Sequence, residues 1–438
     1  MHEAFVTYLW KHRLLKPYGL QTIEGESLTV IHPGIENTDA GPDFLSSRVR
    51  IGQAVWAGNV EVHVLSSDWY RHGHHRDEAY DKVILHVVHD FDRACFNSKG
   101  QPIPALVIRD QFDKEILKRY QTLEGMSDRM FCRRLLKTSD RYWITHWLSR
   151  MLIERLERKA IEMQHFLRFF GNDWEQLFHF FLARNMGARV NALPFGLLAQ
   201  AVPISLIRKY RSHPAQLEAL LFGQAGMLDE SQAGMLDEPC DDPYPGGLRR
   251  EYLYLKRKHG LTPMQGSLWR FARLRPRNFP TIRIAQLSDL YQRPVRLFRA
   301  CMEAPGTGEL RRLLQARASG YWDRHFRFGK RSPEMPKALG KEAIEVLMIN
   351  TIAPISFVYG KLSGKDRLRE KSLRILEEIP PEKNTIVRLW QDSGVRAVNA
   401  SDSQAMLESS SMYCQQKKCL HCLIGYRLIA SRPKRIFG

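Results

Sequence analysis

The sequence predicts an α+β protein: an N-terminal α/β domain, a mainly helical body and a cysteine-bearing C-terminus. Three observations support this fold class. Short β-rich runs separated by Gly and Pro fill the first 110 residues. From residue 139 the apolar residues recur at helical spacing. Three of the seven cysteines lie close to the C-terminus. We expect segment boundaries at residues 1–115, 116–400 and 401–438.

The N-terminal domain is expected to begin with a helix over Glu3–Leu15, where apolar residues have helical spacing. Five strands should follow. The run at Lys82–Val88 is almost continuously apolar, which is typical of a buried central strand. The predicted strands are Ser27–Ile31, Phe44–Ile51, Ala54–Leu65, Lys82–Val88 and Leu106–Ile108.

The helical body should start at Ser139-Asp140, which can cap a helix reaching about Phe170. Further helices are expected after Asn172-Asp173, from Pro214, and around Arg249–His259 and Thr281–Tyr291. The segment Gln224–Glu230 recurs as Gln232–Glu238, a short duplication that we interpret as a surface loop.

Composition excludes several classes of protein. Hydrophobic residues make up 44% of the 438 residues and charged residues 26%, which is typical of a globular chain and excludes general disorder. We find no window of ~18 apolar residues, so a membrane protein is not expected. The start lacks a secretory signal, and an odd number of unevenly spaced cysteines favours a reducing, cytoplasmic compartment.

The charge is distributed unevenly. The whole chain carries +19, but residues 1–110 carry −3 and the remainder +22. Nine of the 16 histidines lie in those first 110 residues. A basic body favours a polyanion, most often nucleic acid, although such charge can also serve solubility alone.

The acidic, histidine-rich part contains the best candidate for a catalytic site. Asp43 precedes a predicted strand, and Glu61 and His63 point to the same face of the next one. Two carboxylates and a third polar group at a sheet edge can hold Mg²⁺ or Mn²⁺ and activate water against a phosphodiester. The alternative is that these residues shape a turn and form ordinary hydrogen bonds.

A second interpretation of the same region uses its other histidines. His72 and His74 share strand parity and, with His63, His75 and Asp68, could chelate Zn²⁺ or Mn²⁺. A solvated histidine-rich loop would give the same sequence.

The pattern of Asp43 after Pro42, followed by Glu61-Val-His63, resembles the PD-(D/E)XK nuclease superfamily. That resemblance implies a helix followed by a four-stranded sheet, and metal-dependent cleavage of DNA or RNA. His63 stands where the superfamily has lysine. An acid on the first helix often contributes, and Glu3 and Glu24 are the candidates here.

A second resemblance covers nearly the whole chain. Several segments look like an uncharacterised bacterial family, domain of unknown function 2851, which implies a bacterial cytosolic protein without an established activity. These segments are Gly34–Phe44, Trp56–His63, Ser67–Trp69, Val83–Val88, Phe222–Gly226, Arg275–Pro280, Arg283–Leu287 and the C-terminal cysteines.

Cys414, Cys419 and Cys422 lie within nine residues, a spacing that predicts a metal site in a reduced protein. Cys132 is the expected fourth ligand, with His421 as the local alternative. Zn²⁺ and [4Fe–4S] both suit four thiolates, and some PD-(D/E)XK nucleases carry such a cluster. Three unrelated buried thiols are the other interpretation.

An arginine-rich segment is the candidate for binding nucleic acid. Between Arg270 and Arg299 there are eight arginines and one acid, with aromatic residues interleaved. Arginine binds phosphate through two nitrogens, and aromatic rings can stack on bases. The candidates for phosphate contact are Arg270, Arg273, Arg275, Arg277 and Arg283. A structural arginine network around core aromatics is equally compatible.

The leading hypothesis is a metal-dependent nuclease that acts on DNA or RNA. A non-catalytic nucleic-acid-binding or scaffold protein on a degenerate nuclease fold is the alternative, favoured by His63 in place of lysine. A metallohydrolase of small substrates would leave the basic body unexplained.

Overall fold

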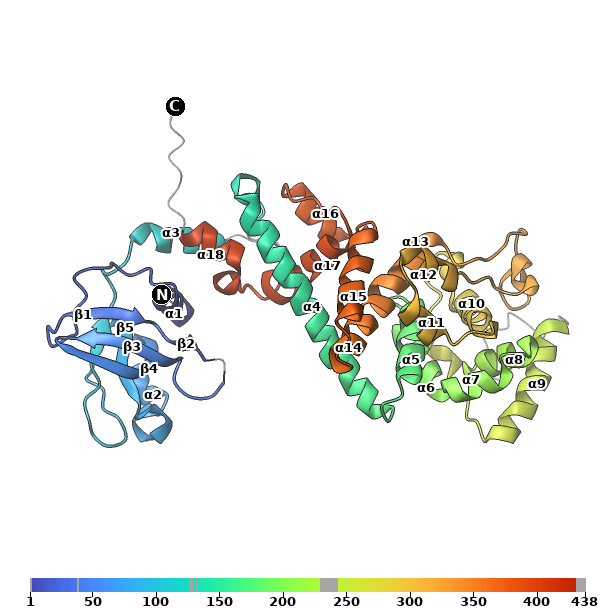
Figure 1. The fold of residues 1–438 in the computed structure, drawn as a ribbon, viewed down its shortest axis with the longest axis horizontal. Coiled ribbons are helices and arrows are strands. Elements are labelled where there is room, and N and C mark those ends of the chain that lie inside the picture. Colours follow the sequence, from blue (N-terminus) through green and yellow to red (C-terminus); the bar gives the residue numbers. More distant parts are fainter. Residues whose placement is uncertain (1, 38, 126–129, 131, 229–242, 431–438) are drawn as a thin grey trace, which may run out of the picture. The chain divides into compact units, whose positions relative to one another are not determined.

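The structure is a computed structural model, and it describes all residues except 1, 38, 126–129, 131, 229–242 and 431–438. Contacts divide the chain into two compact units (Figure 1). Unit 1 comprises Met1–Leu148, Leu389–Val395 and Leu407–Gly438. Unit 2 comprises Ser149–Arg388 and Arg396–Met406.

This division differs from the three expected segments. The boundary expected near residue 115 falls inside unit 1, and most of the expected C-terminal segment belongs to that same unit. The α+β class is confirmed. Most of the duplicated Gly/Asp-rich segment falls in 229–242, outside the described residues.

Unit 1 is built around a six-stranded mixed sheet with helices on its faces and edges. Its elements are α1 (Glu3–Lys11), β1 (Leu28–His32), β2 (Ile35–Glu36), β3 (Phe44–Ile51), β4 (Ala54–Leu65), α2 (Asp68–Arg71), η1 (His74–Arg76), η2 (Glu78–Tyr80), β5 (Val83–Asp90), β6 (Ala105–Val107), α3 (Lys114–Glu124), η3 (Leu136–Thr138), η8 (Ser410–Cys414), η9 (Cys419–His421) and α18 (Leu423–Ala430).

The strand order is β1-β3-β4-β5-β6, with the short β2 also paired to β3. The β3–β4 pair is antiparallel, whereas β5 runs parallel to both of its neighbours. The position of β5 between two strands explains its apolar sequence, because both of its faces are covered. In unit 1 the five predicted strands are all present, and among its described residues the two-residue β2 is the strand that the sequence analysis missed.

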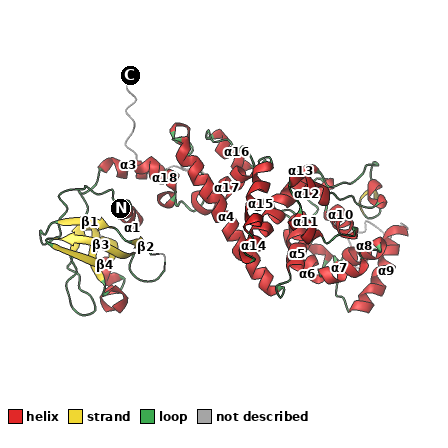
Figure 2. Cartoon of the chain, viewed as in Figure 1, coloured by secondary structure: helices red, strands yellow, loops and turns green. Residues whose placement is uncertain are grey.

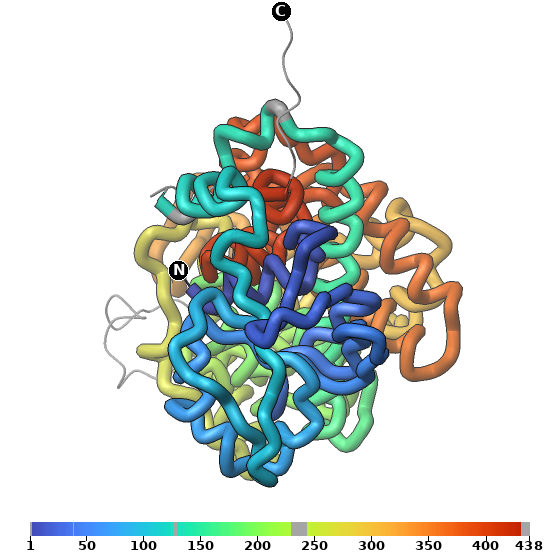
Figure 3. Tube along the Cα trace, turned by 90° about the vertical axis from the view of Figure 1, so that its left-hand side faces the viewer, coloured from blue at the N-terminus to red at the C-terminus, as the bar shows by residue number. Residues whose placement is uncertain are grey.

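The two faces of the sheet have different chemistry. Val60 and Val62 of β4 join Phe5 and Leu9 of α1 in the larger apolar cluster of unit 1. Because side chains alternate along a strand, Glu61 and His63 point to the opposite face. There the crossover between β4 and β5 adds a smaller cluster around Trp69. The blue part of the tube in Figure 3 follows the backbone of this sheet region.

The C-terminal segment of unit 1 packs against its N-terminal part. Ile429 of α18 belongs to the same apolar cluster as α1. The Arg119 side chain of α3 donates from Nε to the carbonyl of Ile429 at 2.8 Å. The Tyr8 hydroxyl donates to the carbonyl of Tyr426 at 3.2 Å. Residues more than 300 positions apart therefore form one core.

Unit 2 is almost entirely helical (Figure 2), as the period from residue 139 predicted. A long helix, α4 (Arg141–Phe169), runs from unit 1 into unit 2. The other elements of unit 2 are α5 (Trp174–Met186), α6 (Ala192–Ala201), α7 (Ile204–Tyr210), α8 (Pro214–Gln224), α9 (Pro243–His259), η4 (Gly266–Leu268), η5 (Pro276–Asn278), α10 (Pro280–Gln292), α11 (Leu297–Glu303), α12 (Thr307–Leu313), η6 (Gly320–Arg324), β7 (His325–Arg327), β8 (Lys330–Arg331), α13 (Lys341–Leu347), η7 (Met348–Ile352), α14 (Ala353–Leu362) and α15 (Asp366–Glu378). Residues of α16 (Thr385–Asp392) and of α17 (Ala400–Ser409) are divided between the two units.

One stretch of unit 2 departs from the expectation that no segment is apolar enough to cross a membrane. Lys341–Leu362 is 22 residues long with a mean hydropathy of 1.5, enough by length and composition to cross a membrane. However, 78% of its most apolar window is buried within the protein. Its apolar character therefore matches that of a core helix, whose side chains are covered by neighbouring helices.

The contact between α8 and α9 gives a test of this core. A Cβ added at Gly223 would lie 2.0 Å from the ring of Tyr252, which is buried and held by a bond from its hydroxyl to Gln224. We expect Gly223→Ala to lower the free energy of unfolding by about 1–3 kcal/mol, because overpacking outweighs the gain in helix propensity. Urea unfolding followed by circular dichroism measures this.

The matched control is Gly247→Ala in α9, where an added Cβ meets nothing within 4 Å. This variant should be as stable as the wild type or more stable by up to about 1 kcal/mol. Equal stability of the two variants would contradict the tight contact between α8 and α9.

Candidate metal centre and nucleic-acid interface

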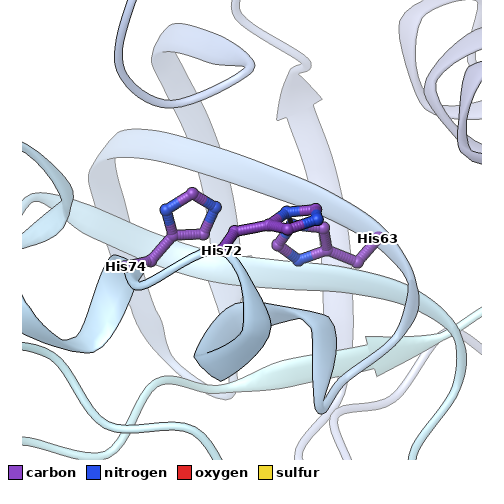
Figure 4. Close-up of side chains that lie close together, drawn as sticks. All are labelled: His63, His72 and His74. Atoms are coloured by element: carbon purple, nitrogen blue, oxygen red, sulfur yellow. Dashed lines mark hydrogen bonds between the residues drawn. The ribbon is translucent and has the colours of Figure 1, made fainter.

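Three histidines of unit 1 bring their ring nitrogens together. The ligand nitrogens of His63, His72 and His74 all lie within 4.8 Å of one another. Figure 4 shows the three imidazole rings gathered beside β4. His63 and His74 are buried, whereas His72 is exposed. The group is thus open to solvent on the His72 side.

The local fold that makes this group differs from the expected one. His72 and His74 do not share strand parity, because His72 follows α2 and His74 begins η1. The residue between them, Gly73, has φ of +80°, a left-handed conformation that glycine adopts without steric cost. This turn directs both imidazoles toward His63 of β4.

Glu61 completes the buried side of the group. Its Oε1 lies 3.1 Å from Nε2 of His74 and 3.6 Å from Nε2 of His63. Nε2 of His74 nevertheless has no hydrogen-bond partner among the described residues. Close approach of a carboxylate oxygen and a ring nitrogen without hydrogen-bond geometry is what two ligands of one cation require.

Asp43 lies directly beside Glu61. The Asp43 backbone N–H donates to Oε2 of Glu61 at 3.0 Å, and Oδ2 of Asp43 accepts from the N–H of Val62 at 3.0 Å. Burial, reinforced by the charge of Glu61, raises the pKa of the Asp43 carboxyl to about 7. Glu3 of α1 also faces this group, and burial raises its pKa. Glu24 is exposed and takes no part.

A further buried histidine orients His63. Nδ1 of His63 and Nε2 of His86 share a hydrogen bond of 2.8 Å. Burial, with the neighbouring imidazoles, lowers the pKa of His63 to about 2 and that of His86 to about 3. A neutral His63 whose Nδ1–H is donated to His86 has the lone pair of Nε2 directed toward Nδ1 of His72, which lies 3.1 Å away, so a proton or a cation can bind between the two rings. The sequence analysis missed this role, although His86 shares its sheet face with His63.

Two other residues of the region lie outside the group. Asp68 is occupied elsewhere, because it accepts from the N–H of Leu65 and pairs with Arg71 at 2.9 Å. The ring of His75 contacts that of Tyr70 at a tilt of 52°, with 5.0 Å between the ring centroids. The predicted catalytic residues Asp43, Glu61 and His63 therefore do come together, and His72 and His74 join them.

Four of the five candidate arginines are exposed in unit 2: Arg270, Arg273, Arg275 and Arg277. Among the described residues no carboxylate forms a salt bridge with any of these four. Arg283 differs, because it is half-buried and donates to Gln286 and Asn278 at 3.0 and 2.7 Å. The expectation that Arg283 contacts phosphate is therefore not supported, since its guanidinium is engaged in hydrogen bonds within the protein, at the start of α10.

The interleaved aromatic residues belong to the core of unit 2. Trp269 is 5% exposed, and its indole N–H donates to the carbonyl of Ala225. Phe271 and Phe279 pack edge to face with centroids 5.1 Å apart. Trp269 is therefore not free to stack on bases, and the partly buried Phe271 and Phe279 are packed against the core.

The predicted cysteines gather in unit 1. Each of Cys414, Cys419 and Cys422 acts electrostatically on Cys132, so all four thiols are neighbours. Burial raises the pKa of the Cys132 thiol well above its ordinary value, and the other thiols add to the effect. The alternative ligand His421 is exposed and points to Glu36, with 3.6 Å between Nε2 and Oε1.

Comparison with known families gives one match. A family model described as a protein of unknown function, DUF2851, matches residues 3–385. Since this range covers most of the chain, the protein belongs to that family. The matched range ends before the C-terminal cysteines. No curated protein and no solved structure matches the chain. Any function must therefore be argued from the geometry above.

The histidine group gives a direct test. We expect Mn²⁺ at 100 times its Kd to stabilise the metal-free protein by about 2.7 kcal/mol, which thermal denaturation reports as a rise of several degrees. His72→Ala and His74→Asn should each reduce that rise, because each removes a ligand nitrogen. His75→Ala is the matched control from the same loop and should keep it. An equal loss in all three variants, or no rise in the wild type, would contradict the site.

Proposed function

We propose that the protein is a divalent-metal-dependent nuclease with its catalytic site in unit 1. The observation that carries this proposal is the convergence of three imidazoles, Glu61 and Asp43 on one side of β4. Such a donor set suits a divalent cation, and buried like charges held together are typical of functional sites.

The order of elements in unit 1 supports the nuclease hypothesis. A helix, three strands of five or more residues with the short β2 between the first two, a crossover and a parallel strand follow one another from α1 to β5. Asp43 precedes the second long strand, and Glu61 and His63 lie on the third. This is the arrangement that the PD-(D/E)XK resemblance implies, with His63 in the position of lysine.

Each side chain has a role in this proposal. Glu61, His63 and His74 would bind the cation from the buried side, and Asp43 would add a second carboxylate. A divalent cation in this position polarises a phosphoryl oxygen and lowers the pKa of bound water. The exposed His72 lies where a phosphodiester would enter, so it can complete the coordination or orient the attacking water. His86 fixes the ring of His63.

The donor set narrows the choice of metal. Mg²⁺ prefers oxygen ligands in octahedral geometry, whereas imidazole suits later transition ions. Mn²⁺ accepts both carboxylate and imidazole, so we infer Mn²⁺ to be a better activator than Mg²⁺.

The basic charge beyond residue 110 supports a nucleic acid as substrate. Arg270, Arg273, Arg275 and Arg277 present guanidinium groups that can contact phosphates. The protein would recognise the sugar–phosphate backbone of the nucleic acid rather than its bases. The neighbouring aromatic side chains are packed in the core and would not stack on bases.

Catalysis is tested with single- and double-stranded DNA and RNA in Mn²⁺ or Mg²⁺. We expect cleavage by the wild type, fastest with Mn²⁺. Asp43→Asn and Glu61→Gln should each slow it by about 10²-fold or more, because each removes a charge that stabilises the transition state. Metal-free Asp43→Asn should be no less stable than the wild type, since it relieves repulsion from Glu61.

His146→Ala, on the exposed face of α4, is the control and should retain full activity. A wild type that binds these substrates but cuts none of them with either metal would reject the nuclease. The alternative, a nucleic-acid-binding protein on a degenerate nuclease fold, would then hold.

The binding of nucleic acid by unit 2 is tested by the salt dependence of its binding constant. Each phosphate that an arginine neutralises releases counterion, which adds about 0.9 to the slope of log K against log salt on duplex DNA. Replacing Arg270, Arg273, Arg275 and Arg277 together by Ala should therefore reduce the slope by up to about four. Arg299→Ala, which removes an arginine paired with Glu303, should leave it unchanged. An unaltered slope in the quadruple variant would assign these arginines another role.

A further inference from the structure

The four cysteines of unit 1 form a closed group, although residue 132 lies far from the other three in sequence. Cys132 precedes η3, Cys414 ends η8, Cys419 begins η9 and Cys422 immediately precedes α18. Every one of the six pairs interacts electrostatically. Cys132 and Cys419 also pack against the same apolar cluster of unit 1.

The spacing of the sulfurs distinguishes between metals. Four thiolates on one zinc ion, at Zn–S distances of ~2.3 Å, lie ~3.8 Å apart. Within the described chain the only group of three ligand atoms that all lie within 4.8 Å of one another consists of histidine nitrogens. No three of these sulfurs are therefore as close together as one zinc ion requires, although all four are near enough to influence one another electrostatically. A cluster of several metal ions accepts thiolates that lie farther apart, because each thiolate binds a different ion.

The surroundings suit thiolate ligands. Cys422 is 8% exposed, and the backbone N–H groups of Gly425 and Ile424 at the start of α18 lie close to its sulfur. The hydroxyl of Ser409 lies close to the sulfur of Cys414. Hydrogen bonds to the sulfurs and exclusion of solvent are what tune iron–sulfur centres. A Cβ at position 425 would lie 2.1 Å from the carbonyl of Cys419, so glycine is required there.

The other described cysteines, Cys95 and Cys301, have no such neighbours. Cys95 donates its S–H to the carbonyl of Ser66 at 3.2 Å, and Cys301 is fully buried in unit 2. They are ordinary isolated thiols, which makes Cys95 a matched control.

We propose that Cys132, Cys414, Cys419 and Cys422 bind a [4Fe–4S] cluster. The cluster joins the segment after α3 to the C-terminal segment and so fixes α18 against the sheet core of unit 1. The proposal stands apart from the nuclease assignment, because it uses none of the residues of the histidine group. Assembly of the site stabilises the fold, since the unfolded chain offers no preformed quartet of thiolates.

The test is metal analysis of the full chain purified without oxygen. The wild type should contain about four iron and four acid-labile sulfide per chain, with the broad visible absorption of a cluster. Cys132→Ser and Cys419→Ser should each lose most of the iron, whereas Cys95→Ser and His421→Ala should retain it. Activity is not the readout, so failure of the nuclease proposal leaves this result interpretable.

Each other result overturns the proposal. About one zinc per chain without sulfide would mean a single-ion site. No metal in the wild type, even after reconstitution with iron and sulfide, would mean four unligated thiols. Loss of iron in His421→Ala, with retention in Cys132→Ser, would replace Cys132 as the fourth ligand. Because the wild type decides the first two outcomes, the test does not depend on the folding of any variant.

Discussion

The alternation of side chains along β4 is the constraint on which unit 1 depends. Val60 and Val62 enter the apolar cluster under α1, so Glu61 and His63 must point to the other face. A slip of one residue would place a carboxylate and an imidazole in that cluster and move the two valines to the polar face of the sheet. Burial of the valines therefore holds the two polar residues in position, and the crossover after β4 supplies the remaining histidines.

The sequence predicted this strand and its polar face because alternation is a local signal. It could not predict how His72 and His74 reach His63, since a left-handed glycine and two short helical turns set their directions. The role of His86 was hidden for another reason. Its strand is apolar on both faces, so only the register with β4 reveals that its ring meets that of His63.

The segment boundaries were less predictable than the elements. Composition and periodicity change near residue 115, but the core of unit 1 also includes Leu420 and Ile429. Packing between segments so far apart leaves no periodic signal in either one. The same limit applies to the arginines, where spacing alone could not separate the braced Arg283 from the exposed Arg275.

The histidine group lowers the stability of the fold, and this energetic cost is the strongest physical reason to propose that the group has a function. Asp43 and Glu61 are held together with Glu3 nearby, and each charge raises the pKa of Asp43. Within the part of the chain that the structure describes, the buried Nε2 of His74 and Nδ1 of His86 lack hydrogen-bond partners. If these positions served only as part of a core, apolar side chains there would make the fold more stable. The proposed cation would resolve the repulsion and the missing bond of His74 together, because it would neutralise the carboxylates and accept the nitrogen lone pair.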